Sequence, residues 1–289
     1  MKRITVISGK GGTGKTTIVS NLAYLADNFI LADCDVDAPN LHILLEPENI
    51  EERVYKSGKL AIKDESKCIN CGICYDYCKF DAITEDYKID PIKCDGCNVC
   101  ATMCPNDAIN LEIKETGQIF KSQSRFGPMI HAKLKAGADN SGKLVSEVRQ
   151  EADDFAEQKD KELILVDGSP GIGCPVIASL NGVDAALVVT EPTMSGLSDL
   201  KRILEVTEYF NISTMVAVNK FDLNMNITEK IEKYCQEKDI PVVGKVPFDP
   251  LINEALRDGE LIVESYKESN TTSSIIKIWE KIKDLKQIS

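Results

Sequence analysis

The stretch at residues 9–17, Gly-Lys-Gly-Gly-Thr-Gly-Lys-Thr-Thr, constrains the fold of this chain more than any other. It has the GxxxxGK[ST] form of a phosphate-binding loop, in which glycines let successive backbone N–H groups face one anion. An apolar, strand-like run precedes it at residues 4–7, and a run with helical spacing follows at residues 18–26. Because a loop of this form requires a strand before it and a helix after it, the sequence predicts a nucleotide site rather than an unliganded glycine-rich turn.

Each part of this loop has a chemical task in binding a nucleotide. The predicted nucleotide-binding residues are Gly9, Lys10, Gly11, Gly12, Thr13, Gly14, Lys15, Thr16 and Thr17. In loops of this form the lysine at position 15 reaches the outer phosphates, and the hydroxyl of Thr16 ligates a magnesium ion. The helix that begins near Thr16 adds the positive end of its dipole to the same anion site. A nucleotide with Mg²⁺ is therefore the expected cofactor.

Two of the later strand-like segments end in carboxylates. A short apolar run leads into Asp33, with Asp35 and Asp37 close behind, and a longer run leads into Asp167. The carboxyl ends of parallel strands form the edge at which open α/β sheets bind ligands. These acids are therefore predicted to orient magnesium or the attacking water, with Asp167 on the magnesium shell. For the first three acids, an Asp-rich turn that caps the next segment explains the sequence equally well.

Strand-like and helical segments alternate along most of the chain. Further strand-like runs occur at residues 185–190, 214–218 and 240–246, and a predicted helix spans residues 143–159. This alternation predicts an α/β fold with a doubly wound, mostly parallel sheet and right-handed crossovers, as in P-loop NTPases.

The last predicted helix, residues 273–287, has an amphipathic pattern. Its apolar stripe consists of Ile275, Ile276, Trp279, Ile282 and Leu285. A stripe of this kind packs on its own domain more often than it lies on a membrane surface, so packing is the expectation.

The segment from Cys68 to Cys104 holds eight of the eleven cysteines and contains an internal repeat. Two copies of C-x2-C-x2-C-x3-C follow one another at an offset of 26 residues. This is the ligand spacing of a two-cluster bacterial ferredoxin, in which the fourth cysteine of each run ligates the other cluster. One [4Fe-4S] cluster would use Cys68, Cys71, Cys74 and Cys104, and the second would use Cys94, Cys97, Cys100 and Cys78. Zinc sites or free thiols are the alternatives, but zinc does not require the third evenly spaced cysteine.

The cysteine repeat divides the chain into two predicted domains. Residues 1–58 and 116–289 form the P-loop ATPase domain, and residues 59–115 form a small inserted α+β domain like a bacterial ferredoxin. The net charge of −12 weighs against binding a nucleic-acid backbone, which relies on Lys and Arg. Neither a signal peptide nor a transmembrane segment is recognisable, so a cytoplasmic protein is expected.

Together these motifs resemble the MinD-type, or deviant Walker A, P-loop ATPases, a family that includes ParA-type partition proteins, the nitrogenase iron protein and Mrp-type iron-sulphur carriers. The chain looks like the branch with an inserted two-cluster ferredoxin domain. Lys10 is the most specific mark of the family, because an ordinary P-loop has no second lysine there. The resemblance implies that the nucleotide is ATP and that two copies enclose it in a homodimer, in which Lys10 reaches the partner's nucleotide.

The resemblance also assigns roles to single residues. Asp33 and Asp35 match the Asp-x-Asp of switch I, whose second member positions the hydrolytic water, and residues 167–171 match the Asp-x-x-Pro-Gly form of switch II. The residues implied near the adenine are Asn219, Pro247 and Asp249. The implied catalytic residues are Lys10, Lys15 and Asp35, and the implied magnesium ligands are Thr16, Asp33 and Asp167.

Two departures from the family limit this transfer. Mrp-type carriers hold a cluster between subunits with a Cys-x-x-Cys pair in the C-terminal half, and this sequence has no such pair. The nitrogenase iron protein uses two cysteines per subunit. Cys174 matches one of them, seven residues after Asp167, but no cysteine lies between Cys104 and Cys174 to serve as the other. Cys174 is therefore predicted to be a buried structural thiol.

The favoured function is an ATPase whose nucleotide-dependent dimer is coupled to two [4Fe-4S] clusters in electron transfer or in metallocofactor maturation, with a redox or assembly protein as partner. The alternative is a positioning or partner-recruiting switch of the MinD/ParA type, in which the clusters only keep the insertion folded. Amide-ligase chemistry on a cobyrinic-type substrate is a third and weaker option.

Overall fold

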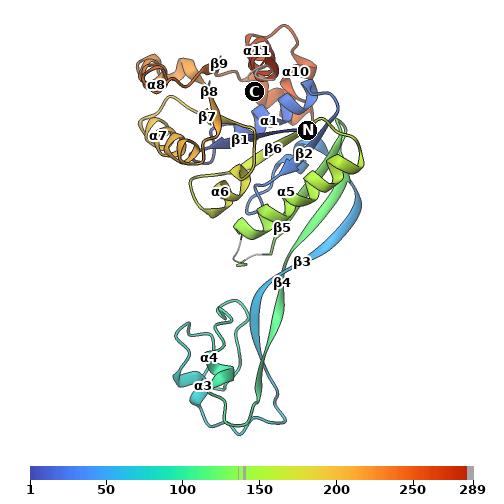
Figure 1. Cartoon of the computed structure of the whole chain (residues 1–289), viewed down its shortest axis with the longest axis vertical. Coiled ribbons are helices and arrows are strands. Elements are labelled where there is room, and N and C mark those ends of the chain that lie inside the picture. The colour runs from blue at the N-terminus through green and yellow to red at the C-terminus, as the bar shows by residue number, and fades with distance from the viewer. Residues whose placement is uncertain (136, 139–140, 285–289) are drawn as a thin grey trace. The chain divides into compact units, whose positions relative to one another are not determined.

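A computed structural model of the chain describes residues 1–135, 137–138 and 141–284 (Figure 1). Over these residues the sheet has the strand order β3-β4-β5-β2-β6-β1-β7-β8-β9, and neighbours from β5 to β9 are parallel. The parallel strands are β1 (Lys2–Ser8), β2 (Phe29–Asp33), β5 (Pro128–Leu134), β6 (Leu163–Pro170), β7 (Ala185–Thr190), β8 (Ser213–Asn219) and β9 (Val242–Val246). The predicted α/β fold with a mostly parallel sheet is confirmed.

Helices cover both faces of the parallel strands, which therefore read as continuous apolar runs (Figure 1). On one face the apolar layer includes side chains of α1 (Lys15–Leu25), α10 (Ile262–Ser265) and α11 (Asn270–Asp284). On the other face it includes α6 (Cys174–Leu180), α7 (Met194–Tyr209) and α8 (Met225–Glu237). Further helices are α2 (Leu41–Leu45), α5 (Ser141–Gln158), α9 (Leu251–Arg257) and the short 3-10 helix Phe221–Leu223.

Helix α11 packs on the sheet as expected, but with a shifted apolar face. Ile275, Ile278, Trp279 and Ile282 are buried, whereas Ile276 is only half-buried. The helix begins three residues before the predicted start at 273, and Leu285 lies outside the described residues. Within the described part of the chain, no helix combines the length and apolar character needed to cross a bilayer.

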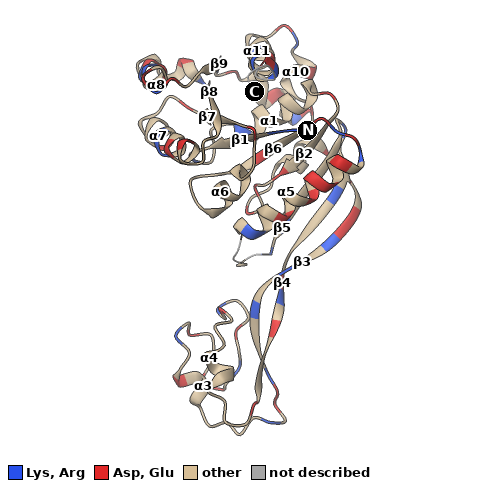
Figure 2. Ribbon diagram, viewed as in Figure 1, with Lys and Arg blue, Asp and Glu red and all other residues tan. Residues whose placement is uncertain are grey.

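Two long strands, β3 (Glu48–Lys63) and β4 (Ile109–Gln123), were not expected, because only a short strand-like run near residues 118–120 is recognisable in this region. Most of β3 is exposed, and both strands carry charges of both signs (Figure 2). Ion pairs join Lys56 to Glu115 at 3.4 Å and Lys121 to Glu51 at 3.2 Å. Strands with so little buried surface lack the alternating pattern by which strands are recognised.

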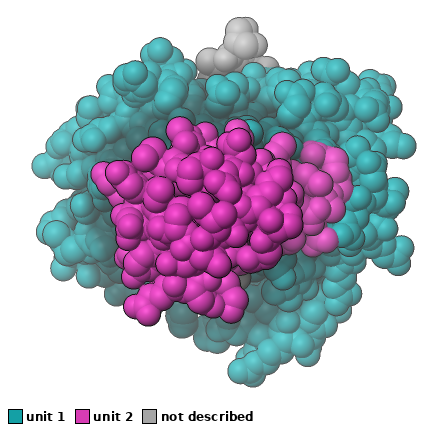
Figure 3. Space-filling view, turned by 90° about the horizontal axis from the view of Figure 1, so that it is seen from below, with its two compact units in different colours: residues 1–52, 119–133, 141–289 teal, residues 53–118, 134–140 magenta. Residues whose placement is uncertain are grey.

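The chain divides into two compact units, drawn in two colours in Figure 3. The sheet unit comprises Met1–Glu52, Ile119–Lys133 and Ser141–Ser289, and the cysteine unit comprises Arg53–Gln118 and Leu134–Asn140. The cysteine unit contains the whole of the predicted insertion, residues 59–115, and both β3 and β4 contribute residues to each unit.

The backbone of the cysteine unit reproduces the sequence repeat. Its two short helices, α3 (Ile73–Asp76) and α4 (Val99–Thr102), both follow a residue in the left-handed conformation. Left-handed residues recur at the repeat offset, as Asn70 with Gly96, Gly72 with Asn98, and Asp81 with Asp107. The amides of Ala82 and Ala108 donate to the sulphurs of Cys78 and Cys104 at 3.4 and 3.2 Å. The two halves are therefore equivalent in conformation as well as in sequence.

Candidate functional site

The glycine-rich loop joins the carboxyl end of β1 to the amino end of α1, at the centre of the sheet. Gly14 caps α1 with φ of 86°, in the left-handed region that favours glycine. A Cβ at this position would also collide with the amide of Asn219, which donates to the Thr13 carbonyl at 2.8 Å. Gly14 is thus required both by its conformation and by the close approach of β8.

Three side chains of the predicted site meet below the loop. The buried ammonium of Lys15 forms an ion pair with Asp167, and the Thr16 hydroxyl donates to the other carboxylate oxygen of Asp167 at 3.0 Å. Burial acts to lower the pKa of Lys15, but the carboxylate of Asp167 more than offsets this, and the pKa is raised overall. The cation at the phosphate-binding position is therefore held fully charged.

Asp33 and Asp35, at and after the carboxyl end of β2, lie beside this group. The Asp33 carboxyl is buried, and burial together with the nearby Asp167 raises its pKa well above the ordinary range. One of its oxygens accepts the amide of Asp35 at 3.0 Å, and the other has no hydrogen-bond partner among the described residues. A buried carboxylate oxygen without a partner suits a cation or its hydration shell, since Mg²⁺ keeps most of its waters and takes few protein ligands. Burial also raises the pKa of Asp35.

A cleft above these residues extends from the phosphate-binding loop to the last helices. Beyond the loop it is lined by Asp35, Asp37, Ala38, Asn40, Ser169, Pro170, Pro175, Asn219, Lys220, Val246, Ile252, Asn253, Leu256 and Ile275. Asn219 lies where it was expected, but Pro247 and Asp249 do not line the cleft. Asp249 instead accepts the amide of Leu251 at 3.0 Å and the hydroxyl of Thr271 at 2.8 Å, which fixes the start of α9. The helix after the turn, rather than the turn itself, faces the cleft.

Lys10, the second lysine of the loop, is held by the segment after β7. Its ammonium forms an ion pair with Glu191 at 2.7 Å and donates to the hydroxyls of Thr193 at 3.3 Å and Ser195 at 2.9 Å. The ammonium of Lys220 lies 3.6 Å from the same glutamate. Sequence reasoning missed Glu191 as a partner, because it lies 181 residues from Lys10 and belongs to no motif of the loop.

The eight repeat cysteines line two small cavities in the cysteine unit. Cys68, Cys71, Cys74 and Cys104 line one of them, and Cys78, Cys94, Cys97 and Cys100 line the other. Each cavity thus takes three cysteines from one run and the fourth from the other, which is the crossed grouping that the ferredoxin spacing predicts. Apolar side chains, including Ile83, Ile89 and Leu111, complete the walls of the second cavity.

The geometry around these cavities differs from that of a single-ion site. Among the residues that the structure describes, no three His, Cys, Asp or Glu side chains are arranged to hold one metal ion. Thiolates that bind one zinc ion converge on a point about 2.3 Å from each sulphur, whereas the cysteines of an iron-sulphur cluster surround a larger body. Among the described residues, the thiols of these cysteines do not converge as the ligands of one zinc ion do.

Comparison with known proteins places the nucleotide site in a family. The model of the CobQ/CobB/MinD/ParA nucleotide binding domain matches residues 4–262. This chain belongs to that family. It is 37% identical over 287 residues to an uncharacterized protein of Methanocaldococcus jannaschii, covering 98% of this chain and 96% of the relative. It is also 25% identical over 279 residues to the septum site-determining protein MinD of Synechocystis, covering 93% and 85%.

Solved structures agree with this family at the level of the fold. Septum site-determining MinD of Pyrococcus horikoshii, complexed with Mg-ADP, matches 99% of this chain and 98% of its own with a TM-score of 0.61 at 19% identity. MinD in the MinC:MinD complex of Aquifex aeolicus matches 98% and 96% with a TM-score of 0.58, also at 19% identity. Other structures with this fold include the cell division ATPase MinD of Pyrococcus furiosus and a ParA family ATPase of Chlorobium tepidum.

The three cysteines outside the repeat of this MinD/ParA-family chain have different surroundings. Cys34 and Cys235 are buried, and burial raises the pKa of Cys235 to about 11. Cys174 is exposed, so the prediction of a buried structural thiol was wrong. It is the first residue of α6, where the chain leaves the switch II loop and its side chain faces outward.

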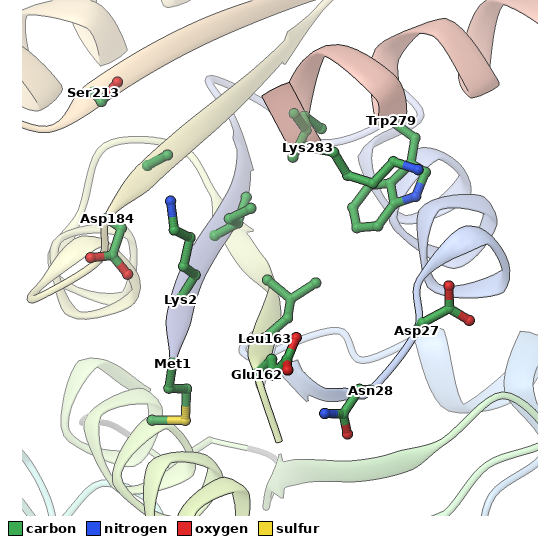
Figure 4. Close-up of a pocket in the computed structure, with 13 residues that line it drawn as sticks. Met1, Lys2, Asp27, Asn28, Glu162, Leu163, Asp184, Ser213, Trp279 and Lys283 are labelled. Atoms are coloured by element: carbon green, nitrogen blue, oxygen red, sulfur yellow. The ribbon is translucent and has the colours of Figure 1, made fainter. Parts of the chain in front are cut away.

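A second large cavity lies at the opposite end of the parallel strands from the nucleotide loop (Figure 4). Its walls include the first residues of four strands, namely Lys2, Leu163, Ala185 and Ser213, together with Trp279 and Lys283 of α11. Charges of both signs surround its apolar floor, and none of the predicted site residues lines it. This cavity is therefore separate from the nucleotide site.

Proposed function

We propose that this chain is an ATP-binding and ATP-hydrolysing switch that recruits a partner protein in one nucleotide state. The observation that carries the proposal is the grouping of Lys15, Thr16 and Asp167 below the glycine-rich loop, with a free oxygen of Asp33 beside them. This grouping supplies a fixed cation for the phosphates and oxygen ligands for magnesium at the edge of the sheet where α/β proteins bind ligands.

Each residue of the site would have its own task in ATP hydrolysis. The backbone amides of the loop and the ammonium of Lys15 would bind and orient the phosphates, while Thr16, Asp33 and Asp167 would hold Mg²⁺, which neutralises charge on the phosphates. Asp35 would accept a proton from the attacking water, and the raised pKa that burial gives this carboxyl makes it a better base near neutral pH. Lys10 would leave Glu191 to reach the nucleotide of a second copy.

Substitution of Asp35 tests the hydrolytic assignment. Asp35→Asn keeps the shape of the side chain and removes the base, so we expect ATP binding to persist while turnover falls by about 10²- to 10⁴-fold. Binding is measured with a fluorescent ATP analogue and turnover by phosphate release. Asp27→Asn, an exposed aspartate that lines the cavity at the opposite end of the strands rather than the nucleotide cleft, is the control and should keep full turnover. Equal turnover in wild type and Asp35→Asn would overturn the role of Asp35.

We further propose that the two cysteine cavities each hold a [4Fe-4S] cluster. The sequence spacing and the crossed grouping of cysteines around the cavities support this proposal. Anaerobically purified protein should contain about eight iron and eight sulphide ions per chain, and Cys97→Ser should lose about half of them. Zinc without sulphide, or no bound metal in freshly purified protein, would contradict the proposal.

The relatives favour a partner-recruiting switch over an electron carrier, because MinD structures include a complex with the protein MinC. In that case the clusters stabilise the cysteine unit and take no part in the reaction. Redox titration with ADP and with a non-hydrolysable ATP analogue distinguishes the two functions. A nucleotide-dependent midpoint potential would support coupled electron transfer, whereas equal potentials, with partner binding intact, would support recruitment alone.

A further inference from the structure

Arg149 of α5 is a buried cation that contacts the end of another helix. Its guanidinium donates from one nitrogen to the carbonyl oxygens of Ala178 and Ser179, both at 3.3 Å, and to that of Asn181. These residues form the last turn and the C-cap of α6 (Cys174–Leu180). Carbonyls at the end of a helix lack partners within the helix, and a cation there also interacts favourably with the helix dipole. Arg149 therefore fixes the carboxyl end of α6 on α5.

The other end of α6 begins where the switch II loop ends. In that loop the amide of Gly171 donates to the carbonyl of Ser8 at 2.8 Å, just before the phosphate-binding loop. The hydroxyl of Ser169 donates to the carbonyl of Cys34, in switch I, at 2.6 Å. Loops with such contacts change conformation when the γ-phosphate is present or lost. Helix α6 is thus the first regular element to follow a nucleotide-dependent movement of switch II.

Helix α5 also contacts the beginning of α6. A Cβ at Gly142, in the first turn of α5, would lie 3.0 Å from the Cβ of Cys174, so the two backbones approach closely there. Helix α5 therefore contacts both ends of α6, through this close packing at the amino end and through Arg149 at the carboxyl end. Along the chain, α5 starts at Ser141, directly after the segment Leu134–Asn140 of the cysteine unit.

We propose that Arg149 is a positioning residue that makes α5 follow α6 when switch II responds to the bound nucleotide. The three hydrogen bonds to one helix end fix its position and direction, which apolar packing alone does not. This inference rests on the proposed nucleotide switch and adds the residue that transmits its state.

Hydrogen exchange of the full-length, cluster-loaded protein tests the proposal. Exchange of the α5 and α6 amides is compared between ADP and a non-hydrolysable ATP analogue in wild type, Arg149→Met, Arg149→Lys and the exposed control Lys143→Met. Methionine keeps the apolar stem and removes every donor. We expect both helices to respond to the nucleotide in wild type and in the control. In Arg149→Met the α6 response should persist while the α5 response is lost, and Arg149→Lys should keep part of it.

A full α5 response in Arg149→Met would overturn the proposal, as would the absence of any α5 response in wild type. General loss of stability would alter both helices together, so the expected split between α6 and α5 is specific to transmission. If Arg149→Met does not fold, Arg149→Lys provides the test. An unchanged response of the α5 amides in Arg149→Lys would contradict the role of the hydrogen bonds made by Arg149. Binding of a fluorescent ATP analogue is measured on the same samples. If wild type does not bind the ATP analogue, the proposed function itself is overturned. If wild type binds it and α5 still responds fully in Arg149→Met, only the role of Arg149 is overturned.

Discussion

At the scale of single residues, ion pairs around the nucleotide loop hold each of its two lysines in a different place. Lys15 is buried and tied to Asp167, whereas Lys10 is partly exposed and tied to Glu191. The motif was sufficient to predict the position of Lys15, since its task is defined by neighbours in the same loop. The contact of Lys10 with Glu191 depends on how β7 lies beside β1, which no local pattern encodes.

The ion pair between Lys10 and Glu191 predicts a restraint on dimer formation. In Glu191→Gln the ammonium of Lys10 is released, so two copies should associate more tightly around an ATP analogue. A partly exposed pair contributes about 0.5–1 kcal/mol, so the dimer dissociation constant should fall by about two- to fivefold. Sedimentation equilibrium measures this change. Glu208→Gln, which removes an exposed ion pair at 3.5 Å between α7 and Lys238 after α8, should leave the constant unaltered. Weaker association of Glu191→Gln would refute the restraint.

The buried His131 predicts a loss of stability in mild acid. Its ring stacks on Phe120 at 4.8 Å and on His42 at 6.1 Å, and burial, with a smaller effect of His42, lowers its pKa to about 4. Below pH 6.5 the unfolded chain binds a proton that the folded chain does not, so stability falls as the pH falls from 6.5 toward 4. By pH 4.5 this costs about 2–3 kcal/mol.

Chemical denaturation at a series of pH values tests this expectation. In His131→Phe, which keeps the aromatic stack, the free energy of unfolding should fall less between pH 7 and pH 4.5, by the same 2–3 kcal/mol. His42→Phe is the matched control with a smaller effect, because His42 is less buried. Identical pH dependence in wild type and His131→Phe would show that His131 does not titrate in this way.

At the scale of elements, buried and repeated patterns were predictable and exposed ones were not. Each of the parallel strands β1, β6 and β7 contains a buried apolar run, and the cysteine repeat is recognisable from its spacing alone. Strand β3 was missed because most of its residues are exposed and many of them are charged. Pro247 and Asp249 do not line the cleft, because Asp249 caps α9 and bonds Thr271, contacts that depend on the packing of α11, and their place near the adenine stays a prediction.

The contact between β9 and α11 predicts a position that does not tolerate a larger residue. A Cβ at Gly244 would collide with the side chain of Ile278, which is fully buried. Gly244→Ala should therefore reduce the free energy of unfolding by about 1–3 kcal/mol, as overpacking does. At Gly173 the nearest atom to an added Cβ lies 3.7 Å away, so Gly173→Ala should stay within about 0.5 kcal/mol of wild type. Urea unfolding measures both, and equal stabilities would contradict the packing described.

At the scale of the whole molecule, the chain combines a family ATPase fold with a separate cysteine unit. The family and its fold follow from the loop, the parallel sheet and the relatives. The two cavities of the cysteine unit group the cysteines as the proposed clusters require, yet no residue that lines the nucleotide cleft belongs to the cysteine unit. Nucleotide-dependent association is therefore the property on which the proposed switch depends, whatever the clusters contribute.

The most direct test of the switch is to measure the molecular mass of Asp35→Asn in solution by sedimentation, with Mg-ATP and with Mg-ADP. This variant should bind ATP without hydrolysing it. We predict a dimer with ATP and a monomer with ADP, because Lys10 can contact the γ-phosphate of the partner's nucleotide only when ATP is bound. Lys10→Ala, made in the same background, should remain a monomer with either nucleotide. The same mass with ATP and with ADP in Asp35→Asn would contradict the account.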